Sequence, residues 1–409
     1  MTKIDELIQE LCPDGVETFP LEECCNILDK KRKPVTKNSR EKGEYPYYGA
    51  NGVQDYVSDY IFNGKFVLVG EDGSVITKSG TPVVTWAEGK IWVNNHAHVI
   101  EEKSGTMLRY LYFYIQTIDV TSLIHGNIPK LTGRDFRSLK IALPPLEIQR
   151  EIVSILDNFT NLTAELTAEL TARKTQYGYY RDKLLEVETD IHKYTLGEIA
   201  TVTKLAGFEF TNYVTYSERG NIIALRGLNV KNGKLDLSDV KYIDKSDFSK
   251  LERSKLHIGD MLFTYVGTVG QVAIVDEEDK YYLAPNVALI RFDKKILLPQ
   301  YMKYYFQTTQ FWDKQIRRLL QSSSMQNIPM EKIRKFEIIV PPFDVQNRIV
   351  NVLDNFEKIC SDLNIGLPAE IEARQKQYEY YRDKLLTFAE TGNTILSRAE
   401  PVSYTHLRA

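Results

Sequence analysis

The chain has 409 residues, of which 43% are apolar and 26% charged, as in ordinary soluble globular proteins. Its net charge of −3 excludes a uniformly basic surface, and its length predicts two or three domains. No apolar run is long enough to span a membrane, and the N-terminal MTKIDELIQEL lacks the apolar core of a signal peptide. Four cysteines without a CxxC pair predict reduced thiols in a cytoplasmic protein and no structural zinc site.

Residues 1–143 predict a first mixed α/β domain. It opens with a basic island, KKRKPVTKNSREK, which has seven basic residues and one acid. The segments KFVLVGE (65–71) and TPVVTWAEGKIWV (81–93) have the composition of strands, and residues 106–118 form an amphipathic helical pattern. A basic island in a chain of nearly neutral charge is a candidate nucleic-acid contact. The alternative interpretation is an ordinary solvated loop, which would have the same composition.

Residues 144–190 predict the first long helix. Its apolar residues follow spacings of four and three, which is the seam of a coiled coil, and the unit TAEL occurs twice in tandem from residue 163 to 170. One unit is nearly one helical turn of strong helix formers, so adding or removing a copy changes the length of the helix without breaking it. The tract is therefore predicted to be a spacer, although incidental repetition in an Ala/Leu-rich helix is the plain alternative.

The second half repeats this plan. Residues 191–340 predict a second α/β domain with strands in NIIALRGL, DMLFTYVG and NVALIRF and an amphipathic helix over 300–320. Residues 341–390 predict a second long helix, with a kink or break at Gly366-Leu367-Pro368. Residues 391–409 are a tail whose last nine residues, PVSYTHLRA, look like translated adapter sequence, so we exclude them from the fold.

Two pairs of segments show that the chain is a tandem duplication. IALPPLEIQREIVSILDNF recurs 197 positions later as IIVPPFDVQNRIVNVLDNF, and RKTQYGYYRDKLL recurs 201 positions later as RQKQYEYYRDKLL. The domains between them share the order of their elements while most of their residues differ. The sequence therefore predicts a repeated scaffold with two different surfaces.

Known catalytic signatures are missing. LPPL and VPPF lack the polar first residue that the (N/D)PP(Y/F) motif of amino-methyltransferases needs, and no phosphate-binding glycine loop is present. His96 and His98 lie on one face of a predicted strand with no third ligand nearby in sequence, so polar contacts are favoured over a metal site. These features indicate a recognition or assembly component.

The repeated PPLxxQ heads, LDNF, the QYxYYRDKLL tails and the TAEL tract resemble the specificity subunit of type I restriction–modification systems, over essentially residues 5–390. The resemblance implies an α+β fold, in which two target-recognition domains are separated by two long antiparallel coiled-coil helices related by a pseudo-twofold axis. In that family each domain reads one half of a split, asymmetric DNA target. The helices set the gap and dock the methyltransferase subunits, and the specificity subunit has no catalytic residues.

The resemblance also implies the partners: double-stranded DNA, two methyltransferase subunits and the restriction/translocase subunits. No cofactor or metal is expected on this chain, whereas the assembled endonuclease and methylation complex would use S-adenosylmethionine, ATP and Mg²⁺. Two other readings stay open. The chain could be a standalone DNA-modifying methyltransferase, or a coiled-coil scaffold without DNA recognition.

The candidate site residues follow from these expectations. Basic residues are assigned to phosphates and polar or aromatic loop residues to bases. In the first domain they are Lys31, Arg32, Lys33 and Lys37 for phosphates, and Tyr47, Asn51, His125 and Asn127 for bases. In the second they are Lys204, Arg317 and Arg318 for phosphates, and Arg226, Tyr265, Ser323, Gln326 and Asn327 for bases. The predicted spacer and coiled-coil residues are Ile152, Phe159, Leu162, Leu166, Leu170, Ile349, Phe356 and Leu363.

Overall fold

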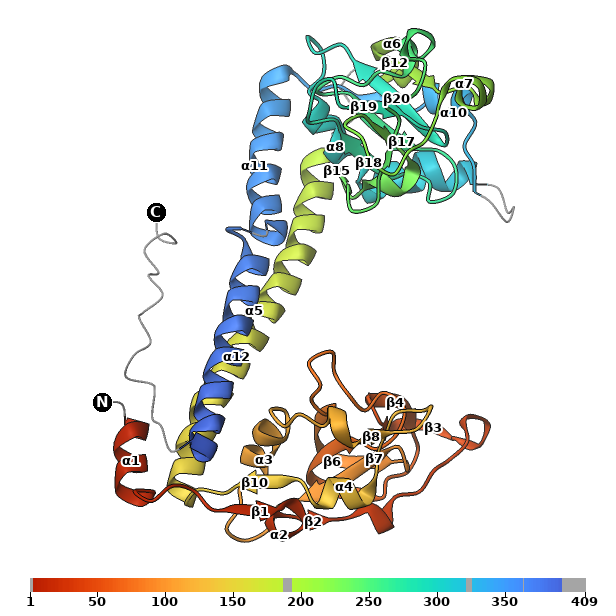
Figure 1. The fold of residues 1–409 in the computed structure, drawn as a ribbon. Coiled ribbons are helices and arrows are strands. Elements are labelled where there is room, and N and C mark those ends of the chain that lie inside the picture. The colour runs from red at the N-terminus through yellow and green to blue at the C-terminus, as the bar shows by residue number, and fades with distance from the viewer. Residues whose placement is uncertain (1–2, 187–192, 321–325, 363, 392–409) are drawn as a thin grey trace. The chain divides into compact units, whose positions relative to one another are not determined.

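In the computed structural model the chain divides into two compact units, residues 1–167 with 370–409 and residues 168–369 (Figure 1). The structure describes residues 3–186, 193–320, 326–362 and 364–391. The predicted base contact Ser323, the predicted seam residue Leu363 and the tail from residue 392 lie outside these ranges. No helix of the described ranges is long and apolar enough to cross a bilayer, and the four cysteines are free thiols.

The first unit is built on a six-stranded sheet of order β2-β7-β5-β6-β3-β4. All neighbouring strands of this sheet are antiparallel except β3 and β6, which pair in parallel. The sheet strands are β2 (Asn26–Ile27), β3 (Lys42–Gly49), β4 (Gly52–Val57), β5 (Phe62–Gly70), β6 (Val84–Val93) and β7 (Ala97–Glu101). The other elements of this domain are α1 (Lys3–Leu11), β1 (Thr18–Pro20), α2 (Leu21–Cys24), α3 (Leu108–Ile115), β8 (Ile124–His125), β9 (Lys130–Leu131), α4 (Gly133–Arg137) and β10 (Lys140–Ala142), with short 3-10 helices over Asp29–Lys31, Lys37–Ser39 and Thr121–Leu123.

Strand β5 has a continuous apolar run because both of its faces are buried. Val67 and Val69 point into the core that α3 and the long helices share, whereas Phe66 and Leu68 point into a second core on the opposite face. Successive side chains of a strand alternate between faces, so a strand covered on both sides loses the apolar–polar alternation. The predicted strands of this domain are confirmed, and the predicted helix over 106–118 is α3.

The second unit holds a four-stranded sheet of order β12-β20-β17-β18 and a three-stranded sheet of order β16-β13-β19, together with the two-stranded pairs β11-β21 and β14-β15. Leu262 on β17 points into one core, while Met261 and Phe263 point into the other. The strands are β11 (Lys193–Thr195), β12 (Ala200–Lys204), β13 (Ile223–Leu225), β14 (Val230–Lys231), β15 (Lys234–Leu235), β16 (Lys241–Tyr242), β17 (Met261–Thr264), β18 (Val272–Ile274), β19 (Tyr281–Leu283), β20 (Val287–Phe292) and β21 (Glu337–Ile339). The helices are α6 (Leu196–Ile199), α7 (Gly207–Tyr213), α8 (Pro299–Phe306), α9 (Thr309–Phe311) and α10 (Met330–Arg334), with a π-helix over Trp312–Ile316 and 3-10 helices over Gly227–Asn229, Phe248–Lys250, Glu252–Ser254 and Arg317–Leu319.

The prediction of one continuous helix over 300–320 is wrong. Helix α8 ends at Phe306, and Thr308 has extended backbone angles and caps a new helix by accepting a hydrogen bond from Phe311 N at 3.2 Å. A threonine that bonds to the backbone in this way offers an alternative to the helical ladder, which apolar periodicity alone does not reveal.

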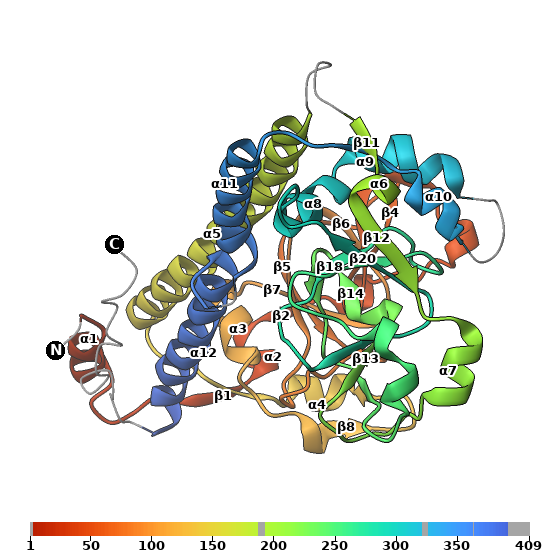
Figure 2. The ribbon, with the colours of Figure 1, turned by 90° about the horizontal axis from the view of Figure 1, so that it is seen from above.

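The long helices are α5 (Leu146–Leu185), α11 (Phe343–Ser361) and α12 (Leu367–Thr391). Helix α5 passes through the TAEL tract without a break. In the first unit the early part of α5 runs antiparallel to α12, and in the second unit its later part runs antiparallel to α11 (Figures 1 and 2). The predicted interruption is confirmed, since α11 ends before Gly366 and Pro368 lies in the first turn of α12.

The predicted seam residues lie between these helices to different degrees. Ile152 is fully buried and Ile349 is 8% exposed. Phe159, Leu162, Leu166, Leu170 and Phe356 are half-buried. The seam is therefore best packed where each helix leaves its domain, and it is more open along the TAEL tract.

A buried glutamine fixes the start of each long helix. Gln149 Oε1 accepts a hydrogen bond from Met107 N at 2.8 Å, and its Nε2 donates to the carbonyls of Gly105 and Pro144. Gln346 makes the same three contacts in the second unit, with the backbone of Leu298, Ile296 and Pro341. Both side chains are fully buried. The glutamine of the PPLxxQ head thus joins the helix to the segment that precedes α3 or α8.

Candidate nucleic-acid interface

A loop after the central strand of each domain forms the floor of an open groove. In the first domain it follows β5, and in the second it follows β17. The glycines Gly73 and Gly267 both have positive φ angles, 84° and 81°, which a glycine adopts without strain. The two loops therefore make the same turn with different side chains.

The same backbone hydrogen bonds hold both loops. Glu71 N donates to His96 O in the first domain, as Tyr265 N donates to Asn286 O in the second. On the other side, Gly73 N donates to Pro129 O, as Gly267 N donates to Gln326 O. Leu131 N donates to Glu71 O, and Ile328 N donates to Tyr265 O. The backbone frame of the groove is thus repeated, bond for bond.

The shared string Asn-Ile-Pro is not equivalent in the two frames. The hydrogen bonds match Pro129 with Gln326 and Leu131 with Ile328, which is a displacement of 197 positions, whereas the strings themselves are displaced by 200. Consequently Asn127 lies in the turn between β8 and β9, while Asn327 forms a bridge with Val266. The string therefore lies in the corresponding loop of each domain but in a different register.

The two grooves differ in chemistry. The first has a volume of about 530 Å³ and the second about 790 Å³. The polar residues of the first are Asn51, Gln54, Asp72, Ser74, His96 and Lys130. Those of the second are Arg226, Lys231, Thr264, Thr268, Gln271 and Asn286. Its aromatic and aliphatic lining residues are Phe210, Tyr216, Leu228, Val230, Val266 and Pro285. One frame therefore presents two different sets of donors and acceptors.

Among the predicted base contacts, the structure brings Asn51 and Arg226 to the grooves. Asn127 and His125 are exposed on the β8–β9 hairpin, whose Ile128 and Lys130 line the first groove. Gln326 and Asn327 are exposed on the loop that frames the second groove. These residues therefore lie in the two grooves or on the loops beside them.

Two predicted base contacts are instead buried in the fold. Tyr47 is 1% exposed, and its hydroxyl accepts a hydrogen bond from Val35 N at 3.0 Å. Tyr265 is 8% exposed, and burial raises the pKa of its phenol. Both rings pack inside their domains, so the prediction that they lie near bases is wrong for their side chains. The composition of a loop does not reveal which of its tyrosines turn inward.

The basic residues of the island are exposed except for Arg32 and Arg40. Arg40 forms an ion pair with Asp55, and its side chain is largely buried. Lys31, Lys33 and Lys37 point to solvent. The side chain of Arg32 is only 12% exposed, and its Nη1 lies 2.6 Å from Glu71 Oε2 and 2.7 Å from Ala97 O. The prediction that Arg32 holds a phosphate is therefore wrong, because its donors are used inside the domain.

The basic candidates of the second domain are all exposed. Lys204 Nζ lies 5.8 Å from the centre of the Tyr265 ring. Arg317 forms a 3.0 Å ion pair with Asp313, and Arg318 follows it in the same 3-10 helix. An exposed pair of this kind contributes little to stability, so Arg317 is available to a phosphate.

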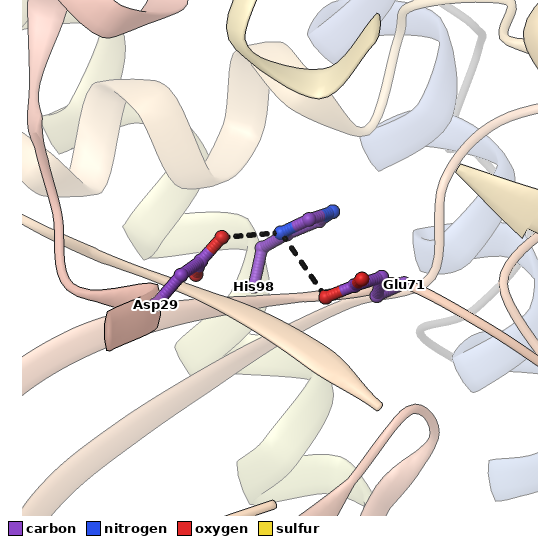
Figure 3. Close-up of side chains that lie close together, drawn as sticks. All are labelled: Asp29, Glu71 and His98. Atoms are coloured by element: carbon purple, nitrogen blue, oxygen red, sulfur yellow. Dashed lines mark hydrogen bonds and ion pairs between the residues drawn. The ribbon is translucent and has the colours of Figure 1, made fainter. Parts of the chain in front are cut away.

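Beneath the first groove lies a buried polar cluster of Asp29, Glu71 and His98, with ligand atoms within 4.8 Å of one another (Figure 3). His98 is fully buried and stacks on Phe136, with ring centres 4.1 Å apart. Its Nδ1 lies 2.7 Å from Asp29 Oδ2 and its Nε2 lies 3.1 Å from Leu131 O, so both ring nitrogens face oxygen acceptors.

The cluster does not fit a metal ion, because a guanidinium already stands where a cation would bind. Arg32 Nη1 is 2.6 Å from Glu71, and its Nη2 is 3.6 Å from Asp29. Burial tends to raise the pKa of Asp29, but the hydrogen bond and charge of His98, with Val99 N and Arg32, hold it below its usual value. The cluster therefore fixes the floor of the groove to the basic island and to β7.

Sequence reasoning missed most groove residues. Gln54, Asp72, Lys130, Gln271 and Asn286 come from separate strands and loops, so no short motif links them. For His96 the sequence favours polar contacts over a metal site, and its ring contacts Asp72. The glycine-containing segments after the predicted strands were the one local signal, since they mark where the loops turn.

Comparisons with known proteins agree with this repeated architecture. The profile of the type I restriction modification DNA specificity domain matches residues 13–173 and 188–373. A type I restriction enzyme specificity subunit from Haemophilus influenzae is 36% identical over 91% of this chain and 96% of its own length. The specificity subunit of the EcoR124I/EcoR124II enzyme from Escherichia coli is 34% identical over 70% of this chain and 72% of its own length.

Solved structures show the same fold at low sequence identity. The S subunit of the type I restriction–modification system from M. genitalium has a TM-score of 0.50 and 14% identity, and the match covers 92% of this chain and 96% of that subunit. A chain from a structure of a type I restriction–modification system has a TM-score of 0.58 and 14% identity, covering 92% and 98%. With two matched regions and a relative of this similarity, the chain belongs to the family of type I restriction–modification DNA specificity domains.

Proposed function

We propose that this chain is the DNA-specificity subunit of a type I restriction–modification complex, in which each domain reads one half of a split, asymmetric target. The observation that carries the proposal is the groove frame, which recurs in both domains with different side chains. Because the backbone frame is the same in both domains, each groove can approach its DNA half-site in the same way. Because the side chains differ, the two grooves can recognise half-sites of different sequence.

Affinity for DNA comes from exposed basic residues and from the grooves. Lysine and arginine neutralise phosphates without reading sequence, which suits Lys31, Lys33 and Lys37 in the first domain. Lys204, Arg317 and Arg318 play this part in the second. The polar side chains of the two grooves then face base edges, where donors and acceptors distinguish the base pairs.

The partners are the DNA and the other subunits of the complex. We assign two methyltransferase subunits to the long helices, with restriction/translocase subunits completing the endonuclease. Val352 and Ile359 on α11 support a docking face, because they are one heptad apart and 43% and 45% exposed. The chain itself is non-catalytic, and S-adenosylmethionine, ATP and Mg²⁺ act on the partner subunits.

The TAEL tract sets the gap between the two half-sites. Helix α5 is on the order of 60 Å long, at 1.5 Å per residue. One TAEL unit adds roughly 6 Å, which corresponds to one or two base pairs of about 3.4 Å each. The tract lies inside α5 with its side chains exposed or half-buried, so a change in copy number disturbs little packing.

The test is to express the chain with its methyltransferase partner and to map methylated sites across the host genome at single-molecule resolution. A split motif with a gap of fixed length is the expected result. Methyl transfer by the purified chain alone would instead favour a standalone methyltransferase. A complex that assembles but binds no DNA in gel shifts would favour a scaffold.

A further inference from the structure

The residues Gly49 and Arg226 occupy the same backbone position in the two domains, next to Ala50 of the first groove and within the second groove. Gly49 is the last residue of β3 and Arg226 directly follows β13, and each comes after a residue that pairs in parallel with another strand. Tyr48 lies opposite Val93 on β6, and Leu225 lies opposite Leu283 on β19. The next backbone contacts also agree. Asn94 N donates to Tyr48 O at 3.1 Å, and Ala284 N donates to Leu225 O at 3.2 Å.

In the first domain the space beside Gly49 is taken by the amide of Gln54. A Cβ atom added at Gly49 would lie 2.0 Å from Gln54 Nε2, so any larger residue would displace that amide. The amide is oriented by Asn94, which is 3% exposed and whose Nδ2 donates to Gln54 Oε1 at 3.3 Å. Gln54 therefore places an amide where the side chain of Arg226 begins in the second domain.

In the second domain Arg226 is held at one edge and directed to the groove. Its Nη2 donates to Asp239 O at 2.8 Å and to Asp239 Oδ1 at 2.9 Å. The fully buried Asn229 fixes this turn, because its Nδ2 donates to the carbonyls of Asp236 and Asp239. Both Nη2 contacts go to Asp239 and Nε is buried, whereas within the described residues Nη1 makes no hydrogen bond. The Nη1 amino group is therefore the donor that remains available in a pre-organised position.

Building on the proposed function, we propose that Arg226 and Gln54 are the specificity-determining residues at one equivalent position of the two half-sites. Arg226 selects guanine, since the two N–H groups of its Nη1 can donate to the N7 and O6 acceptors of that base, whereas adenine presents a donor beside N7. Gln54 selects adenine, since its amide donates to N7 and accepts from the N6 amino group. Asp239 and Asn94 are positioning residues that orient these two side chains.

The experiment is methylome sequencing of a host that expresses the full system with Arg226→Gln, Gln54→Ala or no change. Arg226→Gln should lower discrimination for guanine at one position of one half-site by about 5- to 100-fold and leave the other half-site unchanged. Gln54→Ala should weaken the preference for adenine at one position of the other half-site. Arg253→Gln is the matched control, because it removes an exposed arginine of the same domain outside the groove.

The outcomes separate this proposal from the proposed function. A split motif in the unchanged system that Arg226→Gln leaves intact overturns the role of Arg226 alone. If Arg226→Gln weakens DNA binding equally for all target sequences and lowers the slope of log affinity against log salt by about one, Arg226 is a phosphate contact. That result also overturns its role in base recognition. No split motif in the unchanged system contradicts the proposed function itself. If the complex with Arg226→Gln fails to assemble, Arg226→Lys tests the proposal instead. Lysine should keep the preference for guanine at that position but discriminate less strongly against other bases.

Discussion

The ring of Phe159 stacks on the ring of Tyr381, with centres 5.3 Å apart. The equivalent pair of the second unit, Phe356 and Tyr180, stacks with centres 5.7 Å apart. Each pair joins the LDNF segment of one long helix to the QYxYYRDKLL segment of another. The repeated sequence blocks are therefore the two sides of one packing contact that the chain makes twice.

These pairs lead to a prediction for the TAEL tract. Twenty-one positions separate Phe159 from Tyr180 and 25 separate Phe356 from Tyr381, so one added unit would make the two spans equal. A third TAEL unit after Leu170 should widen the gap of the DNA target by one or two base pairs and leave both half-sites unchanged. Methylome sequencing measures both. A four-residue Gly-Ser insertion at the same place is the control, and it should impair methylation. An unchanged gap or altered half-sites would contradict the prediction.

The second prediction concerns the buried glutamines. Gln149→Leu should destabilise the first unit by about 2–4 kcal/mol, because it leaves a buried donor and two buried acceptors without partners. Gln346→Leu should do the same in the second unit. Thermal and denaturant unfolding of the assembled complex measure the loss. Asn161→Ala, an exposed change on α5, is the control and should shift stability little. A loss no larger than that of the control would show that these hydrogen bonds contribute nothing.

The third prediction separates Arg32 from its basic neighbours. Lys31→Ala and Lys33→Ala should each weaken DNA binding and lower the slope of log affinity against log salt by about one. Arg32→Ala should leave that slope unchanged and lower the unfolding midpoint, since Glu71 and Asp29 would lose a buried partner. Binding is titrated over a range of salt concentrations with the assembled complex. A flatter slope for Arg32→Ala would place its guanidinium on the DNA after all.

The fourth prediction concerns acid stability. The folded state holds the pKa of Asp29 below its usual value, so the ionised carboxylate adds stability that is fully present above about pH 4. That contribution is lost as the pH falls through the lowered pKa. Asp29→Asn should be less stable at neutral pH and lose less stability on acidification, while the exposed Asp59→Asn should follow the unchanged chain. Unfolding curves over a pH series measure this, and parallel curves for Asp29→Asn and the unchanged chain would contradict it.

The long helices and the duplication could be predicted because their signals are local and periodic. A heptad pattern needs only residues three and four apart, and a repeated PPLxxQ head needs only two matching strings. The break at Gly366 also follows from local chemistry, since glycine and proline disfavour a helix interior. These features were confirmed.

The grooves could not be predicted because their residues come from strands and loops that are distant in sequence. Gln54 and His96 come together only through the pairing of β3, β4 and β6. The inward turn of Arg32 depends on Glu71, 39 positions away, so the charge run alone indicated a wholly exposed island. Long-range pairing decides which polar residues face solvent, and a single sequence does not contain it.

The chain enters each domain on one strand and leaves it on a neighbouring one, β1 beside β10 and β11 beside β21. Because both ends of a domain lie side by side, its interior can be exchanged as a cassette without altering the helices to which it is joined. Recombination at these two joints would give new pairs of DNA half-sites from existing parts. The partner enzymes would then inherit a new target without a single change in their own sequences.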